Sequence, residues 1–579
     1  MLTIKETQMG IRKWRSACQN LENEVENLIK KFSLPKPAAQ FLVARHIKED
    51  GINDFLNPKL ASLSDPYRFP GIDKAADRLW NAIRNREPIL IHGDYDTDGI
   101  TATALLSLVL RKNGADVYSF IPHRFDDGYG FTPDSLHKAF AAHDKDFKVL
   151  VTVDCGITSN DAVLEARKMG IDTIITDHHE TAQELPDAFA IINPKIQPEL
   201  EDLQVLSGAG IAFKLSHAFI KYGREHNLGG FSTRLDEVLD YVALGTVADI
   251  VPLLGENRIM VKYGIEVLRK QFRPGIRALI ETSRLQGELT PSDITFKLAP
   301  RINAAGRVGD AGIALQLLES ENIVDAYRYA SVLEKYNSIR QEKEQEIFQE
   351  AKEQIEQSPD LAERYSLLVA GREWHQGVIG IVASRLARDY NRPAIVLTIQ
   401  NEHAYGSGRS VGSLNLIDIL GKVSPLLERY GGHPMAVGIG LLSEKITELS
   451  AALEKHIRTV MNPDDLLEVT EYDGEIELED LSPKFFEMLP QLAPFGHSNP
   501  KPLFRITGLE MVRTMPIGDR HTRGVLQSRR GNSIDFIAFN RKTADFQCGP
   551  LDLLCIPQIN DYYQTRKPQL QIIDFAPLV

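Results

Sequence analysis

The chain has 579 residues, of which 43% are hydrophobic and 25% charged, and its formal net charge is −13. These fractions are typical of globular protein, and a chain of this length should fold as about three or four domains. The acidic excess argues against a general nucleic-acid coat, because nonspecific phosphate binding depends on Lys and Arg. The sequence contains no signal-like apolar start and no long uncharged apolar run, so we expect a soluble cytoplasmic protein without membrane contact.

Three short apolar runs between residues 88 and 179 each end in acidic residues or histidines. They are Pro88–Ile91 before Asp94–Asp98, Val149–Val153 before Asp154, and Thr173–Thr176 before Asp177–His179. Short apolar runs separated by helical stretches predict buried parallel strands of a doubly wound sheet. Such sheets bind ligands at the carboxyl ends of their strands, so the polar side chains should converge on one crevice.

This crevice should hold divalent cations. Two ionised carboxylates about 4 Å apart repel by roughly 4 kcal/mol at an effective dielectric constant near 20, so Asp94, Asp96 and Asp98 need a positive partner. Carboxylates mixed with imidazoles suit Mn²⁺ or Mg²⁺, whereas zinc more often binds thiolates or several histidines. Two ions about 3.5–4 Å apart can activate water and neutralise a phosphoryl transition state. Asp154 follows the central strand and is the candidate bridge between them.

Simpler explanations account for only part of this pattern. The segment from Asp94 to Gly99 matches the start of a calcium loop, but Leu105 replaces the required glutamate and a strand precedes it, so we reject that interpretation. A single aspartate is often a helix cap, and Asp98 could cap a helix over Ile100–Leu110. Capping does not explain three clusters at strand ends.

A long polar helix at about 326–357 should connect two domains. Strands near 365–370 and 394–398 flank a helix that begins near Gly377, which predicts a second α/β unit. Its glycine-rich segments, Gly406–Ser410 and Gly431–His433, would let backbone amides approach an anion, and Ser407 and Arg409 would add donors suited to phosphate. Glycine-rich turns alone are weak signals.

The last hundred residues predict a small closed β domain with one basic face. Residues 462–490 are strongly acidic and resemble a solvated face or a boundary, whereas arginines lie among apolar residues from 501 to 550. The alternation in Ile534–Phe539 and the run Leu570–Ile573 predict strands of an oligonucleotide-binding barrel. A β domain whose arginines only maintain solubility fits the composition nearly as well.

Four segments that we expect to end strands resemble, in order, the motifs of the DHH phosphoesterase superfamily. They are Asp94–Gly99, Val153–Gly156, Asp177–His179 and Gly245–Asp249. Further segments look like the RecJ family of bacterial exonucleases: Arg301–Arg307, Trp374–Gly377, Gly406–Ser410 and Gly431–His433. The resemblance covers nearly the whole chain except its first seventy residues.

The resemblance implies a metal-dependent exonuclease that degrades single-stranded DNA from the 5′ end to 5′-mononucleotides, in DNA recombination and repair. It implies two Mn²⁺ or Mg²⁺ ions, with Asp154 shared between them. The implied metal ligands are Asp94, Asp96, Asp98, Asp154, His178 and Asp249. His179 would contact the scissile phosphate. His92 stands where some DHH hydrolases place a ligand, but Asp94 is better matched to that role, so we expect His92 to lie beside the site.

By the same resemblance, a set of residues should hold the 5′ phosphate: Arg124, Arg301, Ser407, Arg409 and His433. For Arg124 the alternative is an ion pair with Asp126 or Asp127, and His433 could simply close a turn. Single-stranded DNA, single-strand-binding protein and repair helicases are the implied partners, and we expect a monomer.

We therefore expect a multidomain α/β protein: an N-terminal segment at 1–70 packed on a parallel-sheet DHH catalytic domain at 71–325, a connecting helix at 326–360, a DHH-associated α/β domain at 361–460, and an OB-like β-barrel at 461–579. Two alternatives stay open. A DHH oligonucleotidase or phosphatase acting on very short RNA or a nucleotide would share the metal motifs but typically lacks the barrel. A noncatalytic scaffold that binds single strands would have lost metal carboxylates.

Overall fold

The computed structural model describes residues 13–124, 127–128, 130–357, 364–546, 549–560 and 566–577. The chain forms two compact units. The large unit comprises Ser16–Gly306, Asp310–Glu334 and Glu471–Val579. The small unit comprises Arg307–Gly309 and Lys335–Thr470, together with the described residues before Ser16. The large unit is therefore built from both ends of the chain.

A parallel sheet forms the centre of the large unit, with the strand order β3-β2-β4-β5-β6. Its strands are β2 (Ile89–Gly93), β3 (Val117–Phe120), β4 (Val149–Val153), β5 (Asp172–Thr176) and β6 (Ala190–Ile192). Every residue of β2 and β4 is buried, as expected for strands covered on both faces. The three apolar runs of the sequence are thus confirmed as neighbouring strands whose carboxyl ends share one edge.

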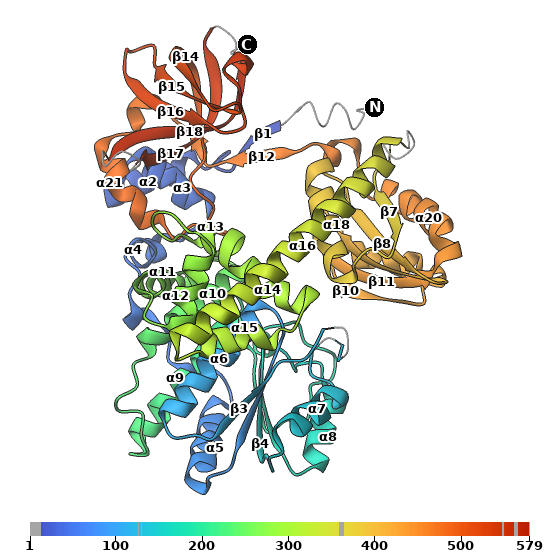
Figure 1. Cartoon of the computed structure of the whole chain (residues 1–579). Helices are drawn as coiled ribbons and strands as arrows, with labels where there is room; N and C mark the ends of the chain where they lie inside the picture. Colours follow the sequence, from blue (N-terminus) through green and yellow to red (C-terminus); the bar gives the residue numbers. More distant parts are fainter. Residues whose placement is uncertain are drawn as a thin grey trace. The chain divides into compact units, whose positions relative to one another are not determined.

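Helices cover both faces of this sheet (Figure 1). One face packs against α7 (Pro133–His143) and α8 (Asn160–Lys168). The other face is covered by α5 (Ile72–Asn85), α6 (Thr97–Lys112) and α9 (Gly208–Glu225). Further helices follow in chain order: α10 (Leu239–Ala248), α11 (Gly255–Lys270), α12 (Pro274–Thr282), α13 (Pro291–Asp293), α14 (Ala299–Val308) and α15 (Gly312–Glu319). Because α10 packs on both α6 and α9, its carboxyl end reaches the same edge of the sheet.

The C-terminal part of the large unit is a closed β-barrel, as the sequence predicts. Its strands are β13 (Gly474–Glu475), β14 (Phe504–Ile517), β15 (His521–Gln527), β16 (Ser533–Ala538), β17 (Leu551–Asn560) and β18 (Lys567–Pro577). The strand order is β13-β14-β15-β16-β18-β17, and pairing of β14 with β17 closes the ring. Phe536 and Ala538 of β16 point into the core, which explains the alternation seen in the sequence.

The N-terminal segment packs on two parts of the large unit. Arg258 of α11 donates to the Phe55 carbonyl at 3.1 and 3.2 Å, and Lys214 of α9 donates to the Ser64 carbonyl at 3.0 Å. The segment's helices α2 (Glu22–Phe32), α3 (Lys36–Ala44) and α4 (Ile52–Leu56) share one hydrophobic core with the barrel and with α21 (Pro483–Leu492).

β1 (Lys13–Ser16) pairs with β12 (Val469–Tyr472). Arg45, which follows α3, forms a buried ion pair with Asp473 and donates to the Pro500 carbonyl at 2.8 Å. The acidic segment near Asp473 is therefore partly a buried junction.

The small unit contains a mixed sheet with the strand order β10-β11-β9-β8-β7. Its strands are β7 (Leu367–Arg372), β8 (Ala394–Gln400), β9 (His403–Arg409), β10 (Arg429–His433) and β11 (Ala436–Leu442), and its helices are α18 (Gln376–Tyr390), α19 (Leu416–Lys422) and α20 (Ile446–Arg458). The expected long helix is α16 (Ile323–Gln357), which passes from one unit into the other. Among the helices that the structure describes, none combines the length and apolarity needed to span a bilayer.

Candidate metal centre and phosphate-binding residues

Three aspartates lie where β2 leads into α6: Asp94 and Asp96 lie between the two elements, and Asp98 lies in the first turn of the helix. Asp96 is the N-cap of α6 and accepts a hydrogen bond from the Gly99 amide at 3.0 Å. The simpler alternative that Asp98 caps this helix does not hold, because the helix begins at Thr97 and Asp98 lies within its first turn. The buried Asp98 carboxylate instead accepts the amides of Gly208 and Ala209 at the start of α9, at 2.6 and 3.0 Å.

Asp154 lies between two groups of candidate ligands. Ligand atoms of Asp94, Asp96 and Asp154 lie within 4.8 Å of one another, and so do those of Asp98, His178 and Asp249. Asp154 Oδ1 is also 3.1 Å from His178 Nε2, so this carboxylate can serve both groups. The backbone of Asp154 has a φ of 61°, in the left-handed region that residues with a Cβ rarely adopt. Backbone strain of this kind is concentrated at functional sites.

Asp249 reaches the centre from a helix instead of a strand. The set Gly245–Asp249 was predicted to end a strand, but it forms the last turn of α10, with Asp249 as the C-cap residue. The strand assignment failed because the apolar residues of this segment are buried all round the helix, which removes the amphipathic periodicity. The ligand role that the resemblance assigned to Asp249 is compatible with its position.

The donor set fits divalent cations. Burial raises the pKa of Asp94, Asp98, Asp154 and Asp249, and neighbouring aspartates raise each pKa further. Burial lowers the pKa of His178 to about 3, so its ring is neutral and can donate a lone pair. Among the described side chains, Asp94 Oδ1, Asp154 Oδ1 and His178 Nε2 are buried without a hydrogen-bond partner. Such a cluster of carboxylates and one neutral imidazole matches the ligand preference of Mn²⁺ and Mg²⁺.

His179 is held beside the metal ligands by Asp177. Asp177 Oδ1 lies 2.7 Å from His179 Nδ1 and accepts the amides of His178 and His179 at 2.7 and 3.1 Å. Burial lowers the pKa of His179, but the hydrogen bond with Asp177 and the negative charges of Asp177, Asp249 and Asp94 together raise that pKa to about 9. A ring nitrogen of His179 also lies within 4.8 Å of ligand atoms of Asp154 and His178. The charged imidazole can thus face a bound anion.

His92 lies behind this centre in the core. Its side chain is fully buried, and its Nε2 is 3.0 Å from Ser135 Oγ. Its ring packs edge-on against Phe131 at 5.0 Å. Burial lowers the pKa of His92 to about 4, so it is a neutral packing residue next to the strand end.

The two arginines expected near the metal ligands have different surroundings. Arg124 lies over the Tyr95 ring, 5.2 Å from its centroid, and its charge lowers the pKa of Asp94. Asp127 pairs with Lys138 instead of Arg124, and Asp126 lies outside the described residues. Arg301 donates through Nε to Glu334 at 2.5 Å and through Nη1 to the Lys297 carbonyl at 2.6 Å. Its charge is therefore balanced within the protein.

The remaining phosphate candidates lie together in the small unit. Arg409 Nη1 donates to Ser407 Oγ at 3.0 Å, and both side chains lie on the same face of β9 against Gly380 of α18. His433 of β10 and Arg409 of β9 are both cross-strand neighbours of Ala436 in β11. The structure thus brings Ser407, Arg409 and His433 into one small patch, in which the small side chain of Ala436 lies between Arg409 and His433.

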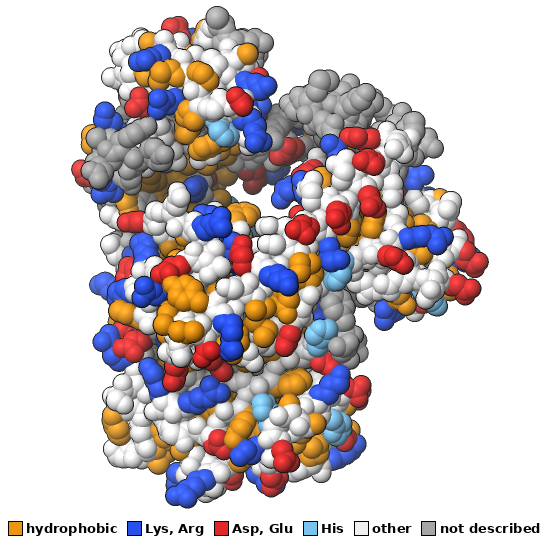
Figure 2. Space-filling view, viewed as in Figure 1, with side chains coloured by type: hydrophobic (Ala, Val, Ile, Leu, Met, Phe, Trp, Pro, Cys, Tyr) orange, Lys and Arg blue, Asp and Glu red, His pale blue; other side chains and the backbone are white. Residues whose placement is uncertain are grey.

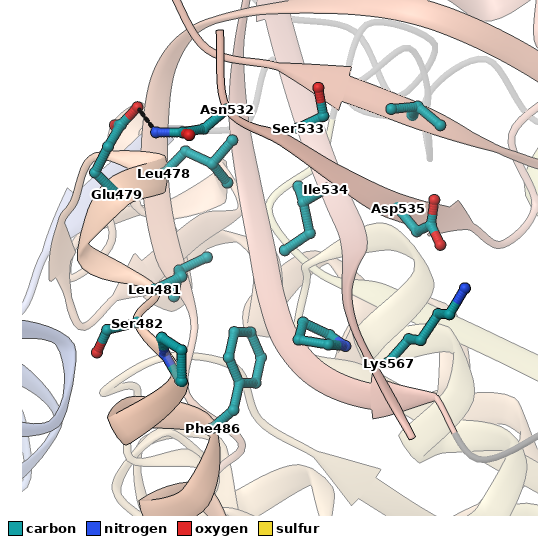
Figure 3. A pocket seen from close by; sticks show the side chains of 13 residues that line it. Leu478, Glu479, Leu481, Ser482, Phe486, Asn532, Ser533, Ile534, Asp535 and Lys567 are labelled. Atoms are coloured by element: carbon teal, nitrogen blue, oxygen red, sulfur yellow. Dashed lines mark hydrogen bonds between the residues drawn. The ribbon is translucent and has the colours of Figure 1, made fainter. Parts of the chain in front are cut away.

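Two adjoining cavities lie on the barrel, where Figure 2 shows Lys and Arg side chains among hydrophobic ones. The first, of about 930 Å³, is lined by Arg513, Arg523, Phe539 and Lys567. The second, of about 680 Å³, lies between the barrel and α21. Figure 3 shows its apolar wall of Leu478, Leu481 and Phe486 facing Ile534, with Asn532 bonded to Glu479 at 2.8 Å.

Sequence reasoning missed two contacts that hold the segment Asp94–Asp98 in place. Asn303 Oδ1 accepts the Thr97 amide at 2.8 Å and the Thr97 hydroxyl at 2.9 Å, which ties α14 to this segment. The other contact is with the start of α9, capped by Ser207. Asn303 lies in the recognised segment Arg301–Arg307, but only Arg301 had been singled out there.

Comparisons with known proteins agree with this architecture. Family models match residues 88–246 (DHH family, N-terminal domain), 364–459 (DHHA1 domain) and 472–574 (RecJ OB domain). The single-stranded-DNA-specific exonuclease RecJ of Bacillus subtilis (strain 168) is 36% identical over 564 residues, which cover 96% of this chain and 70% of that protein. The Escherichia coli (strain K12) enzyme of the same name is 35% identical over 529 residues, covering 88% and 90%.

A solved structure is similar over the same extent. RecJ from Thermus thermophilus in complex with Mn²⁺ has a TM-score of 0.81 and 27% identity, covering 96% of this chain and 78% of that one. The expected fold class, with its parallel-sheet domain, associated α/β domain and barrel, is confirmed. Together with the identity over most of both chains, these findings show that the chain belongs to the RecJ family within the DHH superfamily.

Proposed function

We propose that the chain is a metal-dependent exonuclease that degrades single-stranded DNA from the 5′ end and releases 5′-mononucleotides. The observation that carries the proposal is the buried cluster in which Asp154 serves two groups of ligands. The substrate class and the type of reaction come from the names of its relatives, whose sequences match this chain over most of both lengths.

In this proposal, Asp94 and Asp96 would hold one cation, Asp98, His178 and Asp249 would hold the other, and Asp154 would contribute to both. Two bound cations would activate water as the nucleophile and neutralise the charge that develops on the phosphate. His179 is kept protonated by Asp177 and donates to the scissile phosphate, which favours the transition state. Arg124, whose charge is close to Asp94, helps to orient the same strand.

The polarity of degradation would depend on the 5′ phosphate. Ser407 and Arg409 present a hydroxyl and a planar guanidinium on one face of β9, and His433 is two strands away on the same sheet. Guanidinium groups bind phosphate oxygens in pairs, so this patch is suited to a terminal phosphate. Arg301 belongs to the large unit and would have to leave its ion pair with Glu334 before its guanidinium could bind a phosphate.

The barrel would grip the strand without reading its sequence. Arg513, Arg523 and Lys567 around its larger cavity can contact phosphates, and the half-exposed Phe539 can stack on a base. The family likeness also suggests a monomeric cytoplasmic enzyme of DNA recombination and repair, working with single-strand-binding protein and repair helicases. Copurification of these proteins with the chain on gapped DNA would test that suggestion.

The decisive experiment is a time course on single-stranded DNA labelled at the 5′ or the 3′ end, with Mn²⁺ or Mg²⁺ and an EDTA control. We expect immediate release of mononucleotide from the 5′ label and none with EDTA. Blunt duplex DNA should resist. Early release from the 3′ label would refute the proposed polarity.

Two comparisons separate the alternatives. Asp154→Ala should abolish cleavage and leave binding to single-stranded DNA largely intact, because the barrel does not contain this residue. Cleavage confined to the shortest RNA or DNA oligomers would favour an oligonucleotidase. DNA binding that is insensitive to EDTA, without hydrolysis in Mn²⁺, would favour a scaffold.

A further inference from the structure

The start of α9 holds the Asp98 carboxylate from both sides. Asp98 Oδ2 accepts the Gly208 amide at 2.6 Å and Oδ1 accepts the Ala209 amide at 3.0 Å. These amides lie at a helix N-terminus, where they have no partner within the helix and the partial positive charge favours an anion. Asp98 therefore has a fixed orientation before any cation binds. Asp96, in contrast, is tied to its own helix through the Gly99 amide.

Two glycines make this grip possible. A Cβ on Gly245 of α10 would lie 2.5 Å from Asp98 Oδ1, 2.4 Å from Thr101 Oγ1 and 2.8 Å from the Ala209 Cβ. A Cβ on Gly208 would lie 2.5 Å from Asp154 Oδ1. Side chains here are fully or nearly fully buried, so they have little room to move aside. Any larger residue must displace the carboxylates.

We propose that Gly245 and Gly208 are positioning residues for the metal centre: Gly245 keeps Asp98 in place for the cation shared with His178 and Asp249, and Gly208 keeps Asp154 in place for both cations. This inference rests on the proposed metal-dependent function. It assigns to α9 and α10 a part in metal binding that needs no ligand atom from either glycine.

The two positions should have different effects on metal binding. Gly245→Ala acts on Asp98, which belongs to one ligand group, so it should weaken the binding of one cation and leave the binding of the other unchanged. Gly208→Ala acts on Asp154, which serves both groups, so it should weaken the binding of both cations. Gly210→Ala, on the same helix as Gly208, is the matched control, because a Cβ there would lie 3.4 Å or more from its nearest neighbours, Leu206 and Met260.

The test is calorimetric titration of the full-length, EDTA-treated protein with Mn²⁺ alone. We expect two binding events in the wild type and in Gly210→Ala. In Gly245→Ala one event should be at least tenfold weaker, and high Mn²⁺ should restore cleavage of single-stranded DNA. In Gly208→Ala both events should weaken. Wild-type affinities in Gly245→Ala would overturn the proposal.

A second variant distinguishes displacement of the Asp98 carboxylate from a general packing defect. Thr101→Ala removes the hydroxyl nearest to the new Cβ of Gly245→Ala, but it leaves the Asp98 carboxylate and the Ala209 Cβ in its way. We expect Gly245→Ala/Thr101→Ala to recover part of the lost thermal stability without recovering Mn²⁺ affinity. Recovery of both would show that Gly245 acts through general packing and would refute the inference. Failure of the wild type to bind Mn²⁺ would instead refute the proposed function on which the inference rests.

Discussion

Replacing Asp154 with Asn should stabilise the metal-free protein while it abolishes activity. Ligand atoms of Asp94, Asp96 and Asp154 lie within 4.8 Å of one another. At an effective dielectric constant near 20, two ionised carboxylates at that distance repel by about 3.5 kcal/mol. Asp154 therefore experiences up to about 7 kcal/mol of repulsion when its two neighbours are ionised. The amide of Asn keeps the shape of the side chain and removes this repulsion.

The gain in stability of metal-free Asp154→Asn should depend on pH, because folding raises the pKa of the clustered aspartates. The values are about 7 for Asp98, about 8 for Asp94 and about 9 for Asp249. Without metal, the folded state binds protons more tightly than the unfolded state, so this stability is fully present below the ordinary pKa of 3.8, falls as pH rises above it, and is lost once pH has passed the folded values of about 7 to 9. The gain in stability from Asp154→Asn should thus be small at pH 5 and increase towards pH 9.

Thermal unfolding in EDTA between pH 5 and pH 9 measures this difference. Saturating Mn²⁺ should reverse the order, because a cation present at about 1,000 times its dissociation constant adds about 4 kcal/mol to the wild type. Asp134→Asn, at an exposed position at the start of α7, is the matched control and should change neither result. The reasoning fails if metal-free Asp154→Asn melts at or below the wild type at pH 9, or if it keeps the full stabilisation by Mn²⁺.

Further predictions concern the phosphate contacts and the N-terminal junction. His179→Asn should lower the single-turnover cleavage rate by about 10²–10⁴ and leave Mn²⁺ affinity unchanged, and a normal rate would exclude its role. Arg409→Ala should abolish the preference for 5′-phosphorylated over 5′-hydroxyl strands; equal losses on both substrates would argue against phosphate recognition. Arg45→Met should cost about 3–5 kcal/mol in denaturant unfolding, because it leaves the Asp473 charge buried without its partner. Adding Asp473→Asn should recover part of that loss, and no recovery would contradict the pairing.

The strands and most of the proposed metal ligands could be predicted because their signals are local. A buried parallel strand is a short apolar run, and the ligand-bearing residues follow it directly, as at Asp154. The position of Asp249 could not be read in this way, because helix α10 is buried all round and lacks a periodic pattern. The Asp98 carboxylate is held by backbone amides, and every residue except proline has such an amide, so the sequence does not mark these partners. Likewise, nothing local marks Arg45 as the partner of Asp473.

That last pairing joins residues 428 positions apart, and it has a consequence for synthesis of the chain. Helices α2 and α3 leave the ribosome long before the barrel strands with which they form a core. During that interval Phe41 and Leu42 have no barrel to pack against, while the parallel sheet and the small unit can already fold. A fragment that ends at Thr470 would retain these apolar faces without their cover and would be prone to aggregate. Dissection of the enzyme into stable pieces must therefore remove the N-terminal helices together with the barrel.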